Sequence, residues 1–176
     1  PTERAGETQS DKCARLAAEL TEAGQAQALI TLPDSLAWLL NIRGSDIARN
    51  PVPHGFALLQ ADATVDLFLD PAKLDDDLRA HLGPDVRCHR PETLLDQLGK
   101  QPGPLRLDKG SAPMQVLRRL QQDGVPIAWG EDPCVLPKAC KTQAEIAGAR
   151  EAHLIDAAAV CEFLCWYEAQ PIGSLS

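Results

Sequence analysis

The sequence predicts an α/β fold: a mixed β-sheet flanked by helices and followed by a long C-terminal helix. Short apolar runs alternate with stretches whose apolar residues recur at helical spacing, which is typical of strands alternating with helices. One pair of neighbouring runs is separated only by a short polar turn, and residues 142–170 form one long helical pattern. At 176 residues with 44% apolar and 24% charged side chains, the composition is that of an ordinary globular protein rather than a disordered one.

The predicted fold begins with a helix and a strand. Apolar residues at helical spacing predict a helix over residues 11–23, with Ser10 as its cap and Gly24 as its end. Residues 28–32 form a short apolar run ended by Pro33, and a run of this length favours a buried strand over a helix.

A second helix and a polar loop follow. Asp34 and Ser35 offer side-chain oxygens for capping a helix whose apolar positions continue to residue 42. Arg43 and Gly44 interrupt this pattern, so we expect residues 43–50 to form a loop.

The rest of the chain continues the alternation. Residues 61–63 form a polar turn between two apolar runs, which predicts an antiparallel hairpin. In chain order we expect strands over 55–60 and 64–70, a helix over 71–82, a strand over 86–89, a helix over 91–98, a strand over 104–108, a helix over 112–122 and a strand over 125–129.

The final helix, over residues 142–170, would extend about 40 Å. Ten of the eleven residues from 157 to 167 are apolar, and only Glu162 interrupts them. A helix that is apolar all round must be covered all round. We therefore expect the preceding domain to cover one face, and a part of the protein outside this sequence to cover the rest.

Charge and cysteine content exclude some classes of function. Seventeen basic and twenty-five acidic residues give a net charge of −8, which argues against nonspecific binding to nucleic acid or to an anionic membrane. No apolar run approaches the roughly 20 residues of a membrane span. Six cysteines without CxxC spacing indicate reduced thiols in a cytoplasmic protein, and a start at Pro1 without methionine indicates an excised piece.

Two segments resemble one family. Residues 37–47, AWLLNIRGSDI, and residues 50–52, NPV, resemble the signature of a non-catalytic domain in the Xaa-Pro aminopeptidases, the aminopeptidase P branch of the creatinase superfamily of pita-bread metallopeptidases. A second segment is similar to the entry into the catalytic domain of that family. It comprises residues 136–142, LPKACKT, with Glu145, Gly148, Arg150, Ala152, His153, Asp156, Phe163, Leu164 and Trp166.

The resemblance implies a creatinase N-terminal-like, ribonuclease H-like fold. It also implies a parent enzyme that removes the N-terminal residue of peptides with proline in second position, works as a homodimer, and uses two divalent metal ions, manganese in our expectation. None of the family's ligand motifs is found here, so we expect no catalytic residue and no metal ligand in this chain. The implied domains are a linker over 1–10, a creatinase-like non-catalytic domain over 11–135, and a linker with the first helix of a truncated catalytic domain over 136–176.

The loop over residues 43–50 has two interpretations, and the sequence leaves both open. In the first it is local architecture: Gly44 allows a tight backbone, polar side chains bond nearby N–H groups, and Arg43 pairs with an acid. In the second it faces the catalytic domain and shapes the substrate entrance, with Arg43 steering a peptide carboxylate and Asp46 an amino terminus. The candidate substrate-proximal residues are Arg43, Ser45, Asp46 and Asn50.

Other groups of reactive side chains favour structural roles. Three consecutive carboxylates at residues 75–77 point in different directions, as in a solvated first helical turn. His81, Cys88 and His89 lie across a helix-ending Gly-Pro step, which argues against zinc. We expect Cys161 and Cys165 to pack in a core and His153 to be structural.

Two alternatives to an aminopeptidase fragment stay open. One is a fragment of a prolidase or creatinase, although these enzymes usually lack the domain that carries residues 41–52. The other is a peptidase-like binding module without catalysis, of the kind found in histone chaperones. An aminopeptidase must supply two Asp, one His and two Glu as metal ligands, and a binding module need not.

Overall fold

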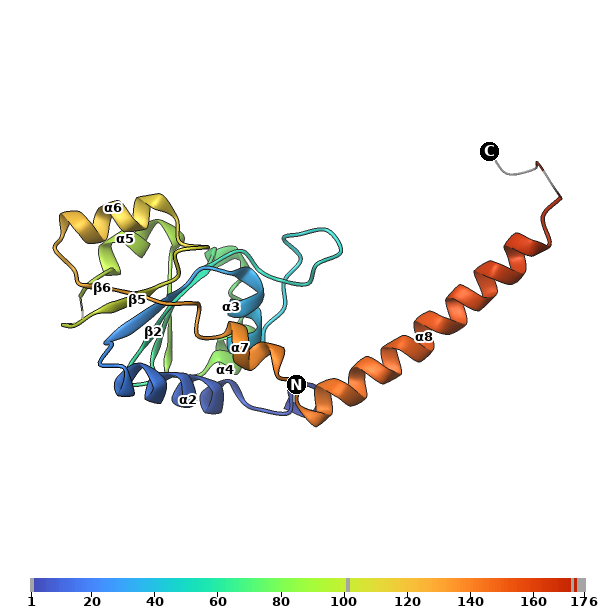
Figure 1. Ribbon diagram of the computed structural model, residues 1–176, viewed down its shortest axis with the longest axis horizontal. Coiled ribbons are helices and arrows are strands. Elements are labelled where there is room, and N and C mark those ends of the chain that lie inside the picture. The colour runs from blue at the N-terminus through green and yellow to red at the C-terminus, as the bar shows by residue number, and fades with distance from the viewer. Residues whose placement is uncertain (1, 101, 172, 174–176) are drawn as a thin grey trace. The chain divides into compact units, whose positions relative to one another are not determined.

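The computed structural model describes residues 2–100, 102–171 and 173 (Figure 1). The chain divides into two compact units, one of residues 7–140 and one that combines residues 1–6 with residues 141–176. The larger unit holds the sheet and the helices around it. The smaller unit holds the long C-terminal helix.

The larger unit is built on a six-stranded sheet in the order β4-β3-β2-β1-β5-β6. The central pairs β1–β2 and β2–β3 are antiparallel, whereas β3–β4, β1–β5 and β5–β6 are parallel. The predicted mixed sheet and the predicted hairpin, β2–β3, are both confirmed. The strands are β1 (Gln27–Ile30), β2 (Phe56–Gln60), β3 (Val65–Phe68), β4 (Val86–His89), β5 (Leu105–Leu107) and β6 (Ile127–Trp129).

Helices cover both faces of this sheet. On one face Leu16 and Leu20 of α2 pack with Leu36 and Leu39 of α3, and on the other Val116 of α6 packs with residues of α5. Neighbouring strand residues point to opposite faces because the side-chain period of a strand is two. The helical segments of this unit are α2 (Gln9–Glu22), α3 (Pro33–Leu39), η1 (Pro71–Lys73), α4 (Asp76–Leu82), η2 (Pro91–Thr93), α5 (Leu94–Gln97), α6 (Met114–Gln122) and α7 (Val135–Ala139).

The caps of the first two helices differ from the prediction. Thr8, not Ser10, caps α2, and its hydroxyl accepts a hydrogen bond from the Asp11 N–H. Helix α3 starts at Pro33, whose fixed φ and missing N–H suit a first helical position, so Asp34 and Ser35 already lie inside the helix. The carboxylate of Asp34 instead pairs with Lys138.

Two predicted helices are interrupted, and the strands other than β4, which spans the predicted residues 86–89, are shorter than predicted. The segment over 71–82 splits into η1 and α4, because Leu74 leaves the helical region and Asp75 caps the second piece through the Leu78 N–H. The segment over 91–98 is likewise a 3₁₀ turn followed by one turn of α-helix.

The smaller unit contains α1 (Thr2–Ala5) and α8 (Gln143–Glu168), which confirms the predicted long C-terminal helix. Thr142 and Glu145 form a capping box at the start of α8, and the Thr142 hydroxyl also donates to the Ala5 carbonyl at 3.1 Å. The segment over 1–10, expected to be a linker, therefore contains α1 and the start of α2.

The expectation that the preceding domain covers one face of α8 stays a prediction. The structure describes every residue of α8, and none of them is buried. Leu154 is 74% exposed, and Phe163, Trp166 and Tyr167 are each more than half exposed. The apolar side chains are distributed around the helix, so no single neighbouring surface could bury them all.

A buried carboxylate joins three strands of the sheet. Asp66 of β3 accepts hydrogen bonds from Arg87 Nε at 2.8 Å, from His89 Nε2 at 2.7 Å and from Gln60 Nε2 at 3.0 Å. Burial by itself raises the pKa of Asp66, but these hydrogen bonds outweigh it and hold the pKa below its ordinary value. The carboxylate is therefore charged at neutral pH and stabilises the β2–β3–β4 half of the sheet.

We predict that Asp66→Asn lowers the free energy of unfolding by about 2 kcal/mol at pH 7, because hydrogen bonds to a charged acceptor are lost. A pKa that is depressed in the folded state gives stability that is present above the ordinary pKa and lost as the pH falls through the folded value. Urea unfolding at pH 7 and pH 3 should thus show that the free energy of unfolding falls less on acidification in Asp66→Asn than in the parent chain. Asp76→Asn, at an exposed helix start, is the control. Equal acid-induced losses in Asp66→Asn and the parent chain would contradict this account.

Candidate functional site

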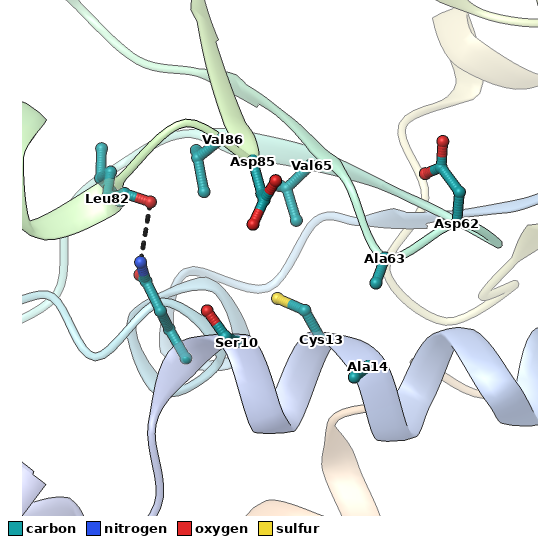
Figure 2. Close-up of a pocket in the computed structure, with 10 residues that line it drawn as sticks. Ser10, Cys13, Ala14, Asp62, Ala63, Val65, Leu82, Asp85 and Val86 are labelled. Carbon is teal, nitrogen blue, oxygen red and sulfur yellow. Dashed lines mark hydrogen bonds between the residues drawn. The ribbon is translucent and has the colours of Figure 1, made fainter.

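A cavity of about 240 Å³ lies in the larger unit between α2 and the β3–β4 side of the sheet (Figure 2). Its inner wall is apolar and includes Val65 and Leu82, and its lining residues also include Asp62 and Asp85. Figure 2 shows the side chains of Cys13, on α2, and Asp85, at the start of β4, pointing toward the same space. Sequence reasoning did not find this cavity, because its walls come from three separate segments of the chain.

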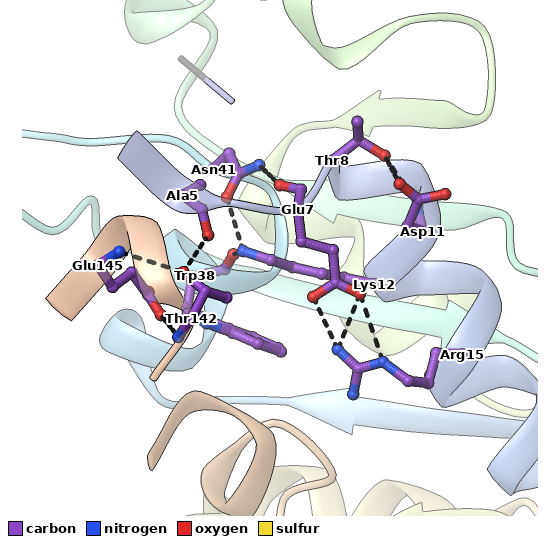
Figure 3. A network of polar contacts seen from close by, with 10 residues as sticks. All are labelled: Ala5, Glu7, Thr8, Asp11, Lys12, Arg15, Trp38, Asn41, Thr142 and Glu145. Carbon is purple, nitrogen blue, oxygen red and sulfur yellow. Dashed lines mark hydrogen bonds and ion pairs between the residues drawn. The ribbon is translucent and has the colours of Figure 1, made fainter. Parts of the chain in front are cut away.

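A buried ammonium group lies where α2 meets the end of α3 (Figure 3). Lys12 is only 1% exposed, and its Nζ donates to the Trp38 carbonyl at 2.8 Å and to Asn41 Oδ1 at 2.7 Å. The same nitrogen lies 4.3 Å from the centroid of the Trp38 ring, within cation–π range. A buried charge is tolerated when it is hydrogen-bonded in this way.

Asn41 extends this contact to the start of α2. It adopts a positive φ of 54°, a conformation that asparagine tolerates better than most residues, and its Nδ2 donates to the Glu7 carbonyl at 2.9 Å. The Glu7 carboxylate in turn pairs with Arg15 at 2.9 Å. The Trp and Asn of the AWLLNIRGSDI segment therefore have a structural role: they fix α2 against the end of α3.

The loop between α3 and β2 extends away from the sheet (Figure 1) and is braced internally. The Gly44 N–H donates to the Pro51 carbonyl at 3.2 Å, and the Asn50 N–H donates to the Ile47 carbonyl at 3.1 Å. A Cβ atom at Gly44 would lie 2.7 Å from the backbone of Pro53, so only glycine fits this position. The loop has a defined shape before anything binds to it.

Two of the four candidate substrate-proximal residues have local partners. Asp46 Oδ2 accepts from the Lys73 ammonium and from the His54 N–H, each at 2.6 Å, and these hydrogen bonds lower the pKa of Asp46. Arg43 Nη1 donates to the carbonyls of Ile42, at 2.8 Å, and Ala37, at 3.5 Å. Asp46 thus bonds a nearby N–H, as the architectural interpretation requires. The expected pairing of Arg43 with an acid is not found among the described residues.

The other two candidates lie on the surface of the same loop. Ser45 and Asn50 are exposed, and neither side chain makes a hydrogen bond within the described part of the chain. The structure therefore gathers all four residues on one loop but does not join them into one hydrogen-bonded cluster.

The groups considered as soft-metal ligands do not converge. His81 Nε2 contacts the Leu40 carbonyl at 2.9 Å, His89 bonds to Asp66 and stacks on Phe68, and Cys88 packs against the core on the opposite face of the sheet. Because side chains alternate between the two faces along a strand, the neighbouring residues Cys88 and His89 of β4 lie on opposite faces of the sheet. Within residues 2–100, 102–171 and 173, no group of three or more His, Cys, Asp or Glu side chains could hold a metal ion.

The six cysteines are free thiols. Cys13 and Cys134 are buried, and burial raises the pKa of the Cys13 thiol to about 12, so it stays protonated at neutral pH. Cys161 and Cys165 are exposed on α8, so their expected packing in a core is not observed in this chain.

Lys12 and Lys73 are structural partners of the signature segment that sequence reasoning missed. For Lys12 a signal existed: it precedes Leu16 and Leu20 at four-residue spacing and so belongs to the buried face of its helix. For Lys73 there was none, because only the fold brings η1 to the loop at Asp46.

Comparison with known proteins shows which protein family the chain belongs to. The family model for the creatinase/prolidase N-terminal domain matches residues 1–145. The chain therefore belongs to the creatinase/prolidase N-terminal domain family, and its fold is of the creatinase N-terminal type, as predicted. Within the described residues, no helix has the length and apolar content needed to cross a membrane.

The relatives within this class are Xaa-Pro aminopeptidases, which confirms the resemblance noted in the sequence. The chain is 32% identical to the probable Xaa-Pro aminopeptidase P of Talaromyces stipitatus over its full length, and equally identical to that of Aspergillus niger over 98% of its length. It spans only 28% and 30%, respectively, of those two proteins.

Solved structures agree with this assignment. The crystal structure of X-prolyl aminopeptidase from Caenorhabditis elegans, described as a cytosolic enzyme with a di-nuclear active site, superposes with a TM-score of 0.84 at 30% identity. The match covers 96% of this chain and 28% of that one. A proline dipeptidase from Streptococcus agalactiae shares the fold at 12% identity and a TM-score of 0.52.

We predict that Lys12→Met lowers the free energy of unfolding by about 2 kcal/mol, because the Trp38 carbonyl and Asn41 Oδ1 lose their buried donor. Lys109→Met, the same change at an exposed lysine, should alter it by less than about 0.5 kcal/mol. Urea unfolding followed by circular dichroism measures both. Equal stability of the two variants would show that the buried ammonium does not fix α2 in place.

Proposed function

We propose that this chain is a non-catalytic domain of a metal-dependent Xaa-Pro aminopeptidase, followed by the first helix of its catalytic domain. The parent enzyme would remove the N-terminal residue that precedes a proline. The observation that carries the proposal is the match to the C. elegans X-prolyl aminopeptidase, which extends over both compact units of this chain. A match confined to the sheet would have supported the assignment of the fold but not the assignment to an aminopeptidase.

The domain layout we propose is a non-catalytic domain over residues 11–135 and an entry into the catalytic domain over residues 136–176. The division of contacts between residues 140 and 141 supports a boundary in this region. The family model, which ends at residue 145, supports it as well. In this proposal α8 belongs to the catalytic domain and not to the sheet domain.

The metal ions of the parent enzyme would be held by residues other than those described here. A pair of divalent ions, which we propose are manganese, needs several carboxylate oxygens converging on one point. The described residues offer no such set, so they do not fit this role and we derive no catalytic step from them. Their contribution would be to the shape of the enzyme.

The exposed apolar surface of α8 supports the proposal that another part of the protein packs against this helix. Phe163 stacks on Tyr167 and lies 5.8 Å from the Trp166 ring, and all three rings are exposed. A surface of this kind marks a site of packing against protein. We propose that the rest of the catalytic domain covers it, and that the enzyme is a cytoplasmic homodimer which binds peptides and neither nucleic acid nor membrane.

The braced loop over residues 43–50 would shape the substrate entrance. Its fixed form supports this role, because a preformed loop loses little conformational entropy when a peptide binds. Arg43 retains guanidinium nitrogens beyond the one that bonds to Ile42 and Ala37, and it is exposed. Ser45 and Asn50 offer polar groups on the same loop, and Asp46 is held charged beside Lys73.

The assignment is tested by a comparison of two proteins. The parent enzyme, supplied with Mn²⁺, should release the N-terminal residue from an Xaa-Pro peptide and leave a matched Xaa-Ala peptide intact. The 176-residue chain should release none, because the residues that the structure describes bring no metal ligands together. Release by the 176-residue chain would refute the non-catalytic assignment, and a parent protein inactive toward every Xaa-Pro peptide would favour a binding module.

The loop is tested by Arg43→Ala in the parent enzyme. If Arg43 meets the peptide carboxylate, KM should rise about tenfold with little change in kcat, the effect of losing one charge-assisted hydrogen bond. Arg118→Ala, at an exposed arginine on α6, is the matched control. Unchanged kinetics in an Arg43→Ala enzyme of normal stability would discard the role at the entrance.

A further inference from the structure

The cavity between α2 and the β3–β4 side of the sheet combines an apolar interior with an acidic rim. Its interior includes Val65, which is fully buried, and Leu82, which is 2% exposed. Its rim includes Asp62 and Asp85. No lysine, arginine or histidine is found among the lining residues that the structure describes. A volume of about 240 Å³ has room for a small organic molecule.

The polar atoms of this cavity are mainly hydrogen-bond acceptors. Gln9 Nε2 donates to the carbonyls of His81 and Leu82, both at 2.8 Å, which fixes the orientation of its amide. Its Oε1 is consequently an acceptor, and it is buried without a partner within the described residues. The Asp85 carboxylate is an acceptor only, and the Ser10 hydroxyl can accept or donate.

The charge of the cavity is negative. The hydrogen bonds from Thr64 lower the pKa of Asp62, so Asp62 is ionised at neutral pH. The Cys13 thiol is neutral there, because burial raises its pKa to about 12. Positive groups lie near the cavity: the N-terminus of α2 contributes about +0.5 of a charge, and Lys12 and Arg87, which are not among the lining residues, act on Cys13 and Asp62. Among the described lining residues themselves, the charged side chains are the carboxylates of Asp62 and Asp85, so the wall of the cavity is negative.

We propose that this cavity binds a small primary alkylammonium ion. The ammonium group would donate to Gln9 Oε1, Ser10 Oγ and the Asp85 carboxylate, and the aliphatic chain would lie against Val65 and Leu82. An ammonium group brings three donors and a positive charge, which complement the acceptors and the carboxylates of the lining. This site is independent of the aminopeptidase assignment, since it lies within the sheet domain and uses no residue of the loop over 43–50.

The experiment compares n-butylammonium with n-butanol, a neutral probe of similar size, on the 176-residue chain at pH 7 and constant ionic strength. Binding is followed through backbone amide chemical shifts. n-Butylammonium should bind at least about tenfold more tightly than n-butanol, as expected for a charge-assisted contact. The shifts should be largest at Cys13, Ala63 and Val86, which line the cavity.

Two isosteric variants test the assignment to the cavity. Asp85→Asn should weaken n-butylammonium binding about tenfold and leave n-butanol binding unchanged. Asp77→Asn removes the same charge at an exposed position outside the cavity and should change neither. Equal affinities for the two probes would overturn the proposal. An equal loss of n-butylammonium affinity in Asp85→Asn and Asp77→Asn would also overturn it. The same holds if the amide shift changes are spread over the surface instead of concentrated at the lining residues.

Discussion

The buried ammonium group of Lys12 is the constraint on which the surroundings of the signature segment depend. Removing a charge from water is costly unless it gains strong partners, and here the partners are the carbonyl of Trp38 and the side chain of Asn41. Because that carbonyl belongs to the last turn of α3, the positive charge also lies at the favourable end of the helix dipole. The contact joins α2 to the end of α3, just before the loop over residues 43–50 begins.

This arrangement explains a segment that sequence comparison alone would assign to function. Trp38 and Asn41 hold helices together, Gly44 permits close contact with Pro53, and Asp46 is tied to Lys73. Most of the signature therefore builds a rigid loop, and only the exposed groups of that loop are available for contact with another molecule. In the enzyme we propose, the domain would act on the reaction through the shape it presents and not through chemistry of its own.

The two units of the chain carry different physical signals. In the larger unit apolar side chains are enclosed on both faces of the sheet, as in a domain that folds around its own core. In the smaller unit the helix is well capped by Thr142 and Glu145, yet it exposes a cluster of aromatic rings. A helix that is well capped but whose apolar side chains are exposed depends on packing against another part of a protein. The alkylammonium cavity belongs to the first kind of unit, because all of its lining residues lie in the sheet domain.

The sequence by itself determined the fold class, the order of the elements, the β2–β3 hairpin and the long final helix, because these depend on local periodicity and turn residues. It also determined family membership, since residues 37–47 and 136–142 carry specific motifs. Only the tertiary structure decided that Lys12 is buried, that Asp46 pairs with Lys73, and that α2 and the β3–β4 side of the sheet enclose a cavity. The reason is that these contacts join residues far apart in the chain, and local patterns carry no information about which distant side chain will meet a given charge.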